Sequence, residues 1–161
     1  MTQIEHWHDF FVAEAGAAAA LAGLLFVAVS INLSHILQFP HLPTRAIEAL
    51  AALLSVLMIA TFGLIPDQPP QALGYEAAAA GAAFLAIQFF TLLTSHKAIA
   101  KYVNWRQHAF FNLAPPLPFF VGGILLALGD MSGLYWFVPG VLLSFLAGVV
   151  GAWVLLIEIQ R

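Results

Sequence analysis

The chain has no cysteine and few charged residues. The absence of cysteine excludes disulfide frameworks, thiolate nucleophiles and iron–sulfur ligation. Aspartate, glutamate, lysine and arginine together make up 8% of the 161 residues, whereas a soluble domain carries about 25%. Because 62% of the residues are also hydrophobic, the composition indicates an integral membrane protein, with the lipid bilayer as its main partner.

Sequence motifs of common enzymes and channels are missing as well. The chain contains no P-loop, no Rossmann fingerprint, and neither an HExxH nor a GxSxG pattern. The TVGYG filter of potassium channels is also absent. The sequence therefore offers no catalytic residue. It favours a protein that is not an enzyme and that does not bind nucleic acid.

Long hydrophobic runs are what the chain has most of. A helix of about 20 residues crosses the roughly 30 Å hydrocarbon core of a bilayer. Five runs of 22 residues or more reach that length, and we predict spanning helices at residues 10–37, 44–65, 72–101, 104–128 and 134–160. Thr44 is the predicted N-cap of the second span. The predicted fold is therefore all-α: a single transmembrane domain, residues 1–161, built as a five-helix bundle.

The basic residues predict how this bundle is oriented. In a five-helix zigzag every lysine and arginine falls on one side of the membrane: Arg45, Lys97, Lys101, Arg106 and Arg161. The opposite side receives Glu5, Asp9, Asp67, Glu76 and Asp130. Because basic residues gather on the cytoplasmic side, the sequence predicts an external N-terminus and a cytoplasmic C-terminus.

The first and third spans resemble each other. The segment EAGAAAA starting at Glu14 is matched by EAAAAGA starting at Glu76, and Ser34-His35 is matched by Ser95-His96. Both spans run in the same direction, so one interpretation is a parallel repeat of two-helix units (spans 1–2 and 3–4) followed by a fifth helix. The other interpretation is that alanine-rich helices resemble one another by composition alone.

Small residues recur at a spacing of four in two spans. Gly16 with Ala20, and Ala19 with Gly23, follow this spacing in the first span. In the fifth span it continues through Gly140, Ser144, Gly148 and Ala152. Such spacing lets helices approach closely within a membrane. We expect internal contacts for the first set and a contact between subunits of a homo-oligomer for the second.

Polar residues inside the spans are candidates for function, because burying them in a membrane is costly. Glu14 and Asn32 are eighteen residues apart, which is five helical turns and therefore one helix face. Two other spans carry polar residues at helical spacing: Glu48 and Ser55 in the second, and Gln88, Thr91 and Ser95 in the third. Turned inward, these residues would line a polar path for a small solute. Alternatively, Glu14 reaches outward, Glu48 serves a helix N-terminus, and the others bond between helices.

Three prolines lie near the middle of the fourth span: Pro115, Pro116 and Pro118. Each lacks an N–H, so the carbonyls of Phe111, Asn112 and Ala114 lose their helical donors. Free carbonyls in a membrane must meet polar groups, water or ions, and broken helices of this kind form binding sites in transporters. Gln88 and Asn112 lie at a suitable depth to contribute to such a site. The alternative is a kinked helix with a purely structural role.

The histidines suggest two further sites. His6 and His8, with Asp9, would suit a divalent transition metal if the segment were extended, whereas on a helix the two rings would diverge. His35 and His96 end the first and third spans at similar depth and could ligate one haem b between the helices. The alternative for each histidine is an interfacial anchor. We expect no cofactor otherwise.

The segments FFVAEAGAAAALAGLLFVAVS, near the start, and AWVLLIEIQR, at the end, resemble a set of small bacterial inner-membrane proteins with no established activity. This resemblance implies a multi-pass protein of the bacterial inner membrane and implies no mechanism. The function we predict from the residues is a small oligomeric membrane protein with a polar path or pocket for a small solute, a cation above all, as in channels and transporters. The alternatives are an accessory or regulatory subunit of a larger membrane complex or protease, and a b-type haem protein.

Overall fold

The computed structural model describes residues 3–39, 42–99 and 105–159, and these residues are almost entirely helical. A short 3-10 helix, η1 (Gln3–Trp7), precedes seven α-helices. They are α1 (His8–Ile31), α2 (Leu33–Ile36), α3 (Leu42–Gly63), α4 (Pro70–Ile99), α5 (Trp105–Leu113), α6 (Pro116–Ala127) and α7 (Gly133–Ile159). No strand occurs in the described ranges. The all-α prediction is therefore confirmed.

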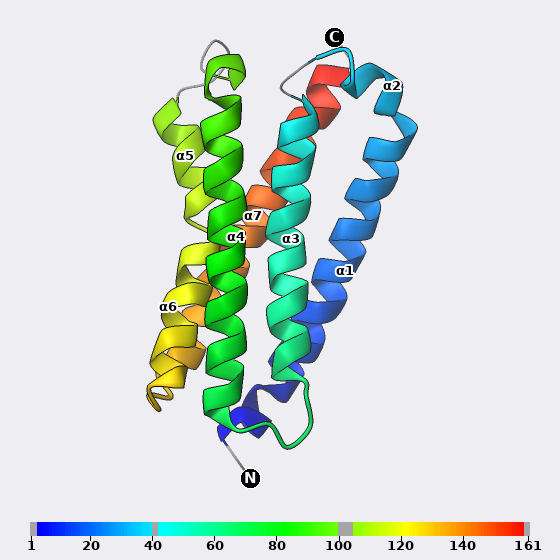
Figure 1. The fold of residues 1–161 in the computed structure, drawn as a ribbon. Helices are drawn as coiled ribbons and strands as arrows, with labels where there is room; N and C mark the ends of the chain where they lie inside the picture. Colours follow the sequence, from blue (N-terminus) through cyan, green and yellow to red (C-terminus); the bar gives the residue numbers. More distant parts are fainter. Residues whose placement is uncertain (1–2, 40–41, 100–104, 160–161) are drawn as a thin grey trace.

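Five helical stretches are long and apolar enough to cross a membrane: His8–Ile31, Leu42–Gly63, Pro70–Leu93, Ala109–Ala127 and Gly133–Trp153. They run between two ends of the bundle (Figure 1). The η1 end carries η1 and the start of α1, and the α2 end carries α2 and the last turns of α7. The chain is thus a multi-pass membrane protein in which successive spans alternate in direction.

The closest helix pair is α4 with α6, and glycines make the approach possible. A Cβ added to Gly81 of α4 would lie 2.7 Å from the backbone N of Phe120 in α6. From the other side, a Cβ on Gly123 of α6 would meet the backbone of Ala78 in α4. Since neither backbone can move aside cheaply, a larger residue at these positions would separate the two helices.

Two buried apolar clusters hold the bundle together. Near the η1 end, the ring of Phe137 in α7 lies 6.4 Å from that of Phe11 in α1 and 6.1 Å from that of Phe119 in α6. Nearer the α2 end, α1, α2, α3 and α7 meet through a second cluster, which includes Leu25, Ile36, Leu42, Leu53 and Leu155. Burial is uneven, however, because α3 is enclosed by neighbours while α1 is exposed along most of its surface.

The first span differs from its prediction near its end. Instead of one helix over residues 10–37, α1 stops at Ile31, Asn32 adopts a turn conformation, and α2 follows. Side chains here bond to the preceding turn: Ser30 Oγ donates to the Phe26 carbonyl and Asn32 Nδ2 to the Ala28 carbonyl. Such bonds compete with the helical backbone and bend it, which explains the break.

The second span begins two residues earlier than predicted. Helix α3 starts at Leu42, so Thr44 lies within its first turn and is not the N-cap. Pro43 does not prevent this start, because a proline in the first helical turn needs no N–H donor.

The fourth span is divided into two helices at its prolines. Helix α5 ends at Leu113, and α6 begins at Pro116 after a turn at Ala114 and Pro115. Proline at the first position of a helix is favourable, since its fixed φ suits the helix and its missing N–H is not needed there. The predicted single helix over 104–128 is therefore a helix–turn–helix pair within one span.

Candidate functional site

Five polar side chains are buried inside the described part of the bundle: Glu48, Ser55, Gln88, Asn112 and Ser144. They come from α3, α4, α5 and α7, and we call them the polar cluster. Counted at 1.5 Å per residue from the α2 end, Glu48 and Asn112 lie about 10 Å deep and Gln88 and Ser55 about 15–20 Å deep. Ser55 lies past the midpoint of α3 and Ser144 lies near the middle of α7, so the five residues extend from the α2 end to the middle of the bundle.

Ser55 and Ser144 connect α3 to α7. The Ser55 hydroxyl donates to the carbonyl of Ala52 at 2.7 Å, and its oxygen lies 3.5 Å from that of Ser144. Because the one hydroxyl hydrogen of Ser55 is already donated to Ala52, Ser144 is the donor of the bond between the two serines. Ser144 is fully buried, although from the sequence we had assigned it only to the small-residue series.

Gln88 is the member of the cluster with an unmet hydrogen-bonding group. The side chain is 2% exposed, and its Oε1 is buried without a hydrogen-bond partner in the described structure. Buried side-chain oxygens are nearly always bonded, so an exception points to an absent partner. Thr91, one turn further along α4, donates its hydroxyl to the Gln88 main-chain carbonyl at 2.8 Å. The side chain of Ser95 lies outside the described residues.

Asn112 and Glu48 complete the cluster near the α2 end. Asn112 is buried in the last turn of α5, directly before the break, where Pro115 and Pro116 leave the carbonyls of Phe111 and Asn112 without helical donors. The carbonyl of Ala114 is in the same position with respect to Pro118. Glu48 is 7% exposed, two turns into α3. Helices α3, α4 and α5 thus supply a buried carboxylate, two buried amides and the main-chain carbonyls at the break, all of which offer oxygen ligands.

The acidic residues at the η1 end are anchored by local hydrogen bonds. Gln68 Nε2 donates to the Glu76 carboxylate at 2.6 Å. In the α6–α7 loop, the backbone N–H of Ser132 donates to Asp130 Oδ1 at 2.9 Å. This bond, supported by the Ser132 side chain, lowers the pKa of Asp130, which keeps its charge over a wider pH range.

Glu14 and Asn32 share the face of α1 that turns toward α3 and α7, as their spacing predicted. Phe11, Ala18 and Leu25 are the buried residues of this face, so the side chains between Glu14 and Asn32 on it are apolar. Glu14 has a buried Oε2 without a partner in the described structure. Because the stretch between them is apolar, α1 supplies no continuous polar line, and we leave both residues out of the polar cluster.

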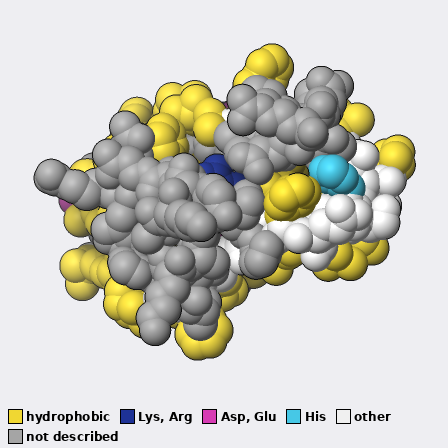
Figure 2. Space-filling model, turned by 90° about the horizontal axis from the view of Figure 1, so that it is seen from above, with side chains coloured by type: hydrophobic (Ala, Val, Ile, Leu, Met, Phe, Trp, Pro, Cys, Tyr) yellow, Lys and Arg dark blue, Asp and Glu magenta, His cyan; other side chains and the backbone are white. Residues whose placement is uncertain are grey.

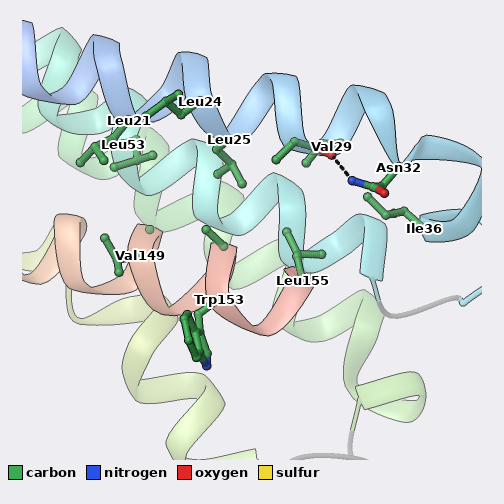
Figure 3. Close-up of a pocket in the computed structure, with 13 residues that line it drawn as sticks. Leu21, Leu24, Leu25, Val29, Asn32, Ile36, Leu53, Val149, Trp153 and Leu155 are labelled. Atoms are coloured by element: carbon green, nitrogen blue, oxygen red, sulfur yellow. Dashed lines mark hydrogen bonds between the residues drawn. The ribbon is translucent and has the colours of Figure 1, made fainter. Parts of the chain in front are cut away.

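Asn32 instead lies at an apolar groove between α1, α3 and α7 (Figure 3). The groove has a volume of about 330 Å³. Its lining includes Leu21, Leu25 and Asn32 of α1, Leu53 of α3, and Gly148 and Trp153 of α7. Among the described lining residues, Asn32 is the one with a polar side chain apart from the indole N–H of Trp153, and its Nδ2 is turned onto the Ala28 carbonyl. Sequence reasoning missed this groove, because a hydrophobic run gives no sign of how far neighbouring helices diverge.

The two sets of small residues do not pack as predicted. In α7, an added Cβ at Gly140 would lie 2.7 Å from the Phe119 ring, and one at Gly148 would lie 2.8 Å from the Leu53 side chain. The fifth span therefore uses these residues inside the protein, and the predicted contact between subunits there is wrong. In α1, by contrast, a Cβ at Gly16 or Gly23 would meet nothing within 4 Å.

The metal site predicted from His6 and His8 rested on an extended segment, and that premise is wrong. Residues 3–7 form η1 and α1 begins at His8, so the two imidazoles diverge. Both side chains are exposed, and His8 contacts only the neighbouring Asp9, at 3.4 Å. Within the described ranges, no group of three histidine, aspartate or glutamate residues could hold a metal ion.

The haem prediction involves one described histidine. His35 lies in α2, its ring 5.4 Å from that of Phe39, and its Nε2 is buried without a partner in the described structure. The side chain of His96 lies outside the described residues. The pair thus stays a prediction, which an absorption spectrum of the purified protein would test.

Comparison with known proteins identifies no relative of this chain. No family model matches the chain, and searches of curated proteins and of solved structures find no match either. Function must therefore be argued from two features of the chain itself: the polar cluster and the apolar groove.

Proposed function

We propose that this protein binds a small cation in a pocket formed by the polar cluster and conducts it as a small channel- or transporter-like protein. The observation that carries this proposal is Gln88, whose Oε1 is buried inside a membrane span without a hydrogen-bond partner among the described residues. An unsatisfied polar group in hydrocarbon costs several kcal/mol, so a membrane protein retains one where a ligand or water meets it.

The chemistry of the surrounding groups favours a cation. Amide, carboxylate and carbonyl oxygens replace the water shell of a hard cation, and selectivity filters are built from them. Here Glu48 supplies the negative charge, and the break between α5 and α6 supplies carbonyls. At the η1 end, Asp67, Glu76 and Asp130 would raise the local concentration of cations. The proposal also places the protein in the bacterial inner membrane, where it would assemble as a homo-oligomer.

The test is a flux assay in liposomes with a panel of monovalent and divalent cations. We expect Gln88→Leu to lower the flux by about tenfold or more, equivalent to 1.4 kcal/mol of lost stabilisation, because it removes one oxygen ligand. Gln71→Leu is the matched control: Gln71 lies on the same helix but is exposed at the η1 end, so flux should be unchanged. If the wild-type protein passes no cation faster than protein-free liposomes, the proposal fails.

A second candidate is an accessory or regulatory subunit of a larger membrane complex. The observation that favours it is the open strip on α1, where Gly16 and Gly23 have no neighbour within 4 Å and Ala19 and Ala20 are exposed. Small residues of this kind allow close helix contact with another membrane protein. Purification from native membranes in mild detergent should then recover a partner with the wild-type protein, and Gly16→Leu should lose it.

A further inference from the structure

We propose that the groove between α1, α3 and α7 holds one acyl chain of an anionic phospholipid, with the head group at the α2 end. This site shares no residue with the polar cluster and does not depend on the proposed cation transport. The first support is its shape. Lining residues run from Leu21 of α1 to Asn32 at its C-terminal end, which is about 16 Å of helix, and Ile36 of α2 continues the lining. A groove that long, 330 Å³ in volume and almost wholly apolar fits a hydrocarbon chain.

The groove is buried at its floor and exposed at its rim. Leu25, Leu53 and Leu155 at the floor are at most 4% exposed, whereas Leu24 and Trp153 at the rim are 69% and 63% exposed. The rim therefore faces the lipid side of the bundle, so a chain can enter from the bilayer. A membrane-embedded apolar recess excludes water, which would lose its hydrogen bonds there.

The size of the groove rules out a helix as its occupant. An α-helix with side chains is about 10–12 Å across, and a length of about 16 Å of it far exceeds 330 Å³. A second copy of this chain could cover the groove but could not fill it. Apart from the indole N–H of Trp153, a polar solute would find one polar lining side chain, Asn32, whose Nδ2 already donates to the Ala28 carbonyl. An acyl chain is the occupant that matches both the volume and the chemistry.

We assign the selection of the head group to two groups near the α2 end that lie outside the groove lining, His35 and Arg45. His35 lies one turn beyond Asn32, with its Nε2 buried and unpartnered among the described residues. Arg45 lies in the first turn of α3, next to Ala46, which belongs to the same buried cluster as Leu25 and Leu155 of the groove floor. Figure 2, which views this end, shows a histidine and a basic side chain on the described surface. Positive charge at the cytoplasmic side of spans attracts anionic head groups.

The test is native mass spectrometry of the purified protein with added phosphatidylglycerol or phosphatidylcholine. We expect the wild-type protein to retain one phosphatidylglycerol under conditions that strip other lipids, and to retain phosphatidylcholine less well. Ala28→Phe would fill the groove from α1. It should weaken retention roughly tenfold, because each methylene displaced from apolar contact weakens binding by about fourfold. Ala152→Leu, which fills the groove from α7, should act in the same direction.

Two further variants distinguish lipid binding in the groove from general adhesion of lipid to the protein surface. Ala20→Phe places the same ring on an exposed position of α1 outside the groove and should retain lipid like the wild type. Arg45→Gln should keep a bound lipid but lose the preference for phosphatidylglycerol. Unchanged retention in both filled variants would overturn the site, and equal retention of the two lipids by the wild type would overturn the anionic occupant. Because none of these variants touches the polar cluster, a failure here leaves the flux assay unaffected.

Discussion

At the scale of single residues, Gly148 decides how closely α7 approaches α3. An added Cβ would lie 2.8 Å from the side chain of Leu53, which is itself 2% exposed. We therefore expect Gly148→Leu to destabilise the folded protein by about 1–3 kcal/mol through overpacking. Thermal unfolding in mild detergent measures this loss.

The matched control is Gly16→Leu in α1. No atom lies within 4 Å of its added Cβ, so the free energy of unfolding should change by less than about 0.5 kcal/mol. If both variants unfold at the temperature of the wild type, α7 does not use Gly148 inside the bundle. A lower stability without a change in oligomer mass is the result that the structure leads us to expect.

The sequence predicted the buried polar residues better than the small ones, for a physical reason. Glu48, Ser55 and Gln88 were candidates for an inward-facing path and Asn112 for a site at the same depth, and all four are buried, since a polar side chain that faces lipid is costly. Gly16 has no polar side chain, so no desolvation cost determines which way it faces. A small residue suits any close helix contact, so its spacing does not tell whether the neighbouring helix belongs to the same chain.

At the scale of helices, the break between α5 and α6 is the element whose role can be tested directly. Pro115 deprives the Phe111 carbonyl of its helical donor, and Pro115→Ala would restore the N–H. If the freed carbonyls line the cation pocket, Pro115→Ala should lower cation flux in liposomes while the protein stays folded. The expected loss is several-fold, since one of several oxygen ligands is withdrawn.

Pro139→Ala is the control for this variant. Pro139 lies inside α7 and also removes a helical hydrogen bond, but the carbonyl that loses its donor is that of Tyr135, in the first turn of α7 at the η1 end. Its replacement should leave flux unchanged. Equal flux in all three proteins would show that the break serves only to shape the fourth span.

The break at Asn32 and the break between α5 and α6 differ in how well the sequence predicts them. Three prolines interrupt the fourth span because their chemistry forbids a regular helix there, and the position of the turn follows. The break at Asn32 was missed, because a single asparagine is compatible with a helix and its effect depends on the bond to Ala28. His8 shows a different case: the extended segment that a metal site at His6 and His8 requires does not form, because α1 already begins at His8.

At the scale of the whole molecule, composition was enough to predict five apolar helices, and the arrangement of those helices was not predictable. Hydrophobic length determines what crosses a bilayer, whereas the neighbours of each helix depend on shape. The close α4–α6 contact at Gly81 and Gly123, and the divergence of α1 that leaves the groove, are of this second kind. The parallel repeat suggested by the first and third spans stays a prediction.

The orientation of the bundle is the last prediction. Successive spans alternate in direction, so Arg45 lies at the α2 end, while Asp67, Glu76 and Asp130 lie at the η1 end. Basic residues near the ends of spans resist translocation, so we expect the α2 end in the cytoplasm and η1 outside. Both proposals depend on this orientation, because the acidic end would receive cations and the basic end would hold an anionic head group.

The absence of cysteine makes the orientation easy to measure. Gln71 at the η1 end and Gln38 at the α2 end are both exposed, so Gln71→Cys and Gln38→Cys each introduce one accessible thiol into a chain that otherwise has none. With a membrane-impermeant maleimide on spheroplasts of the bacterial expression host, we expect labelling of Gln71→Cys at once and of Gln38→Cys only after the membrane is dissolved. The wild-type protein should stay unlabelled throughout. The reverse pattern would place the basic end outside and would contradict the assignment made from the charges.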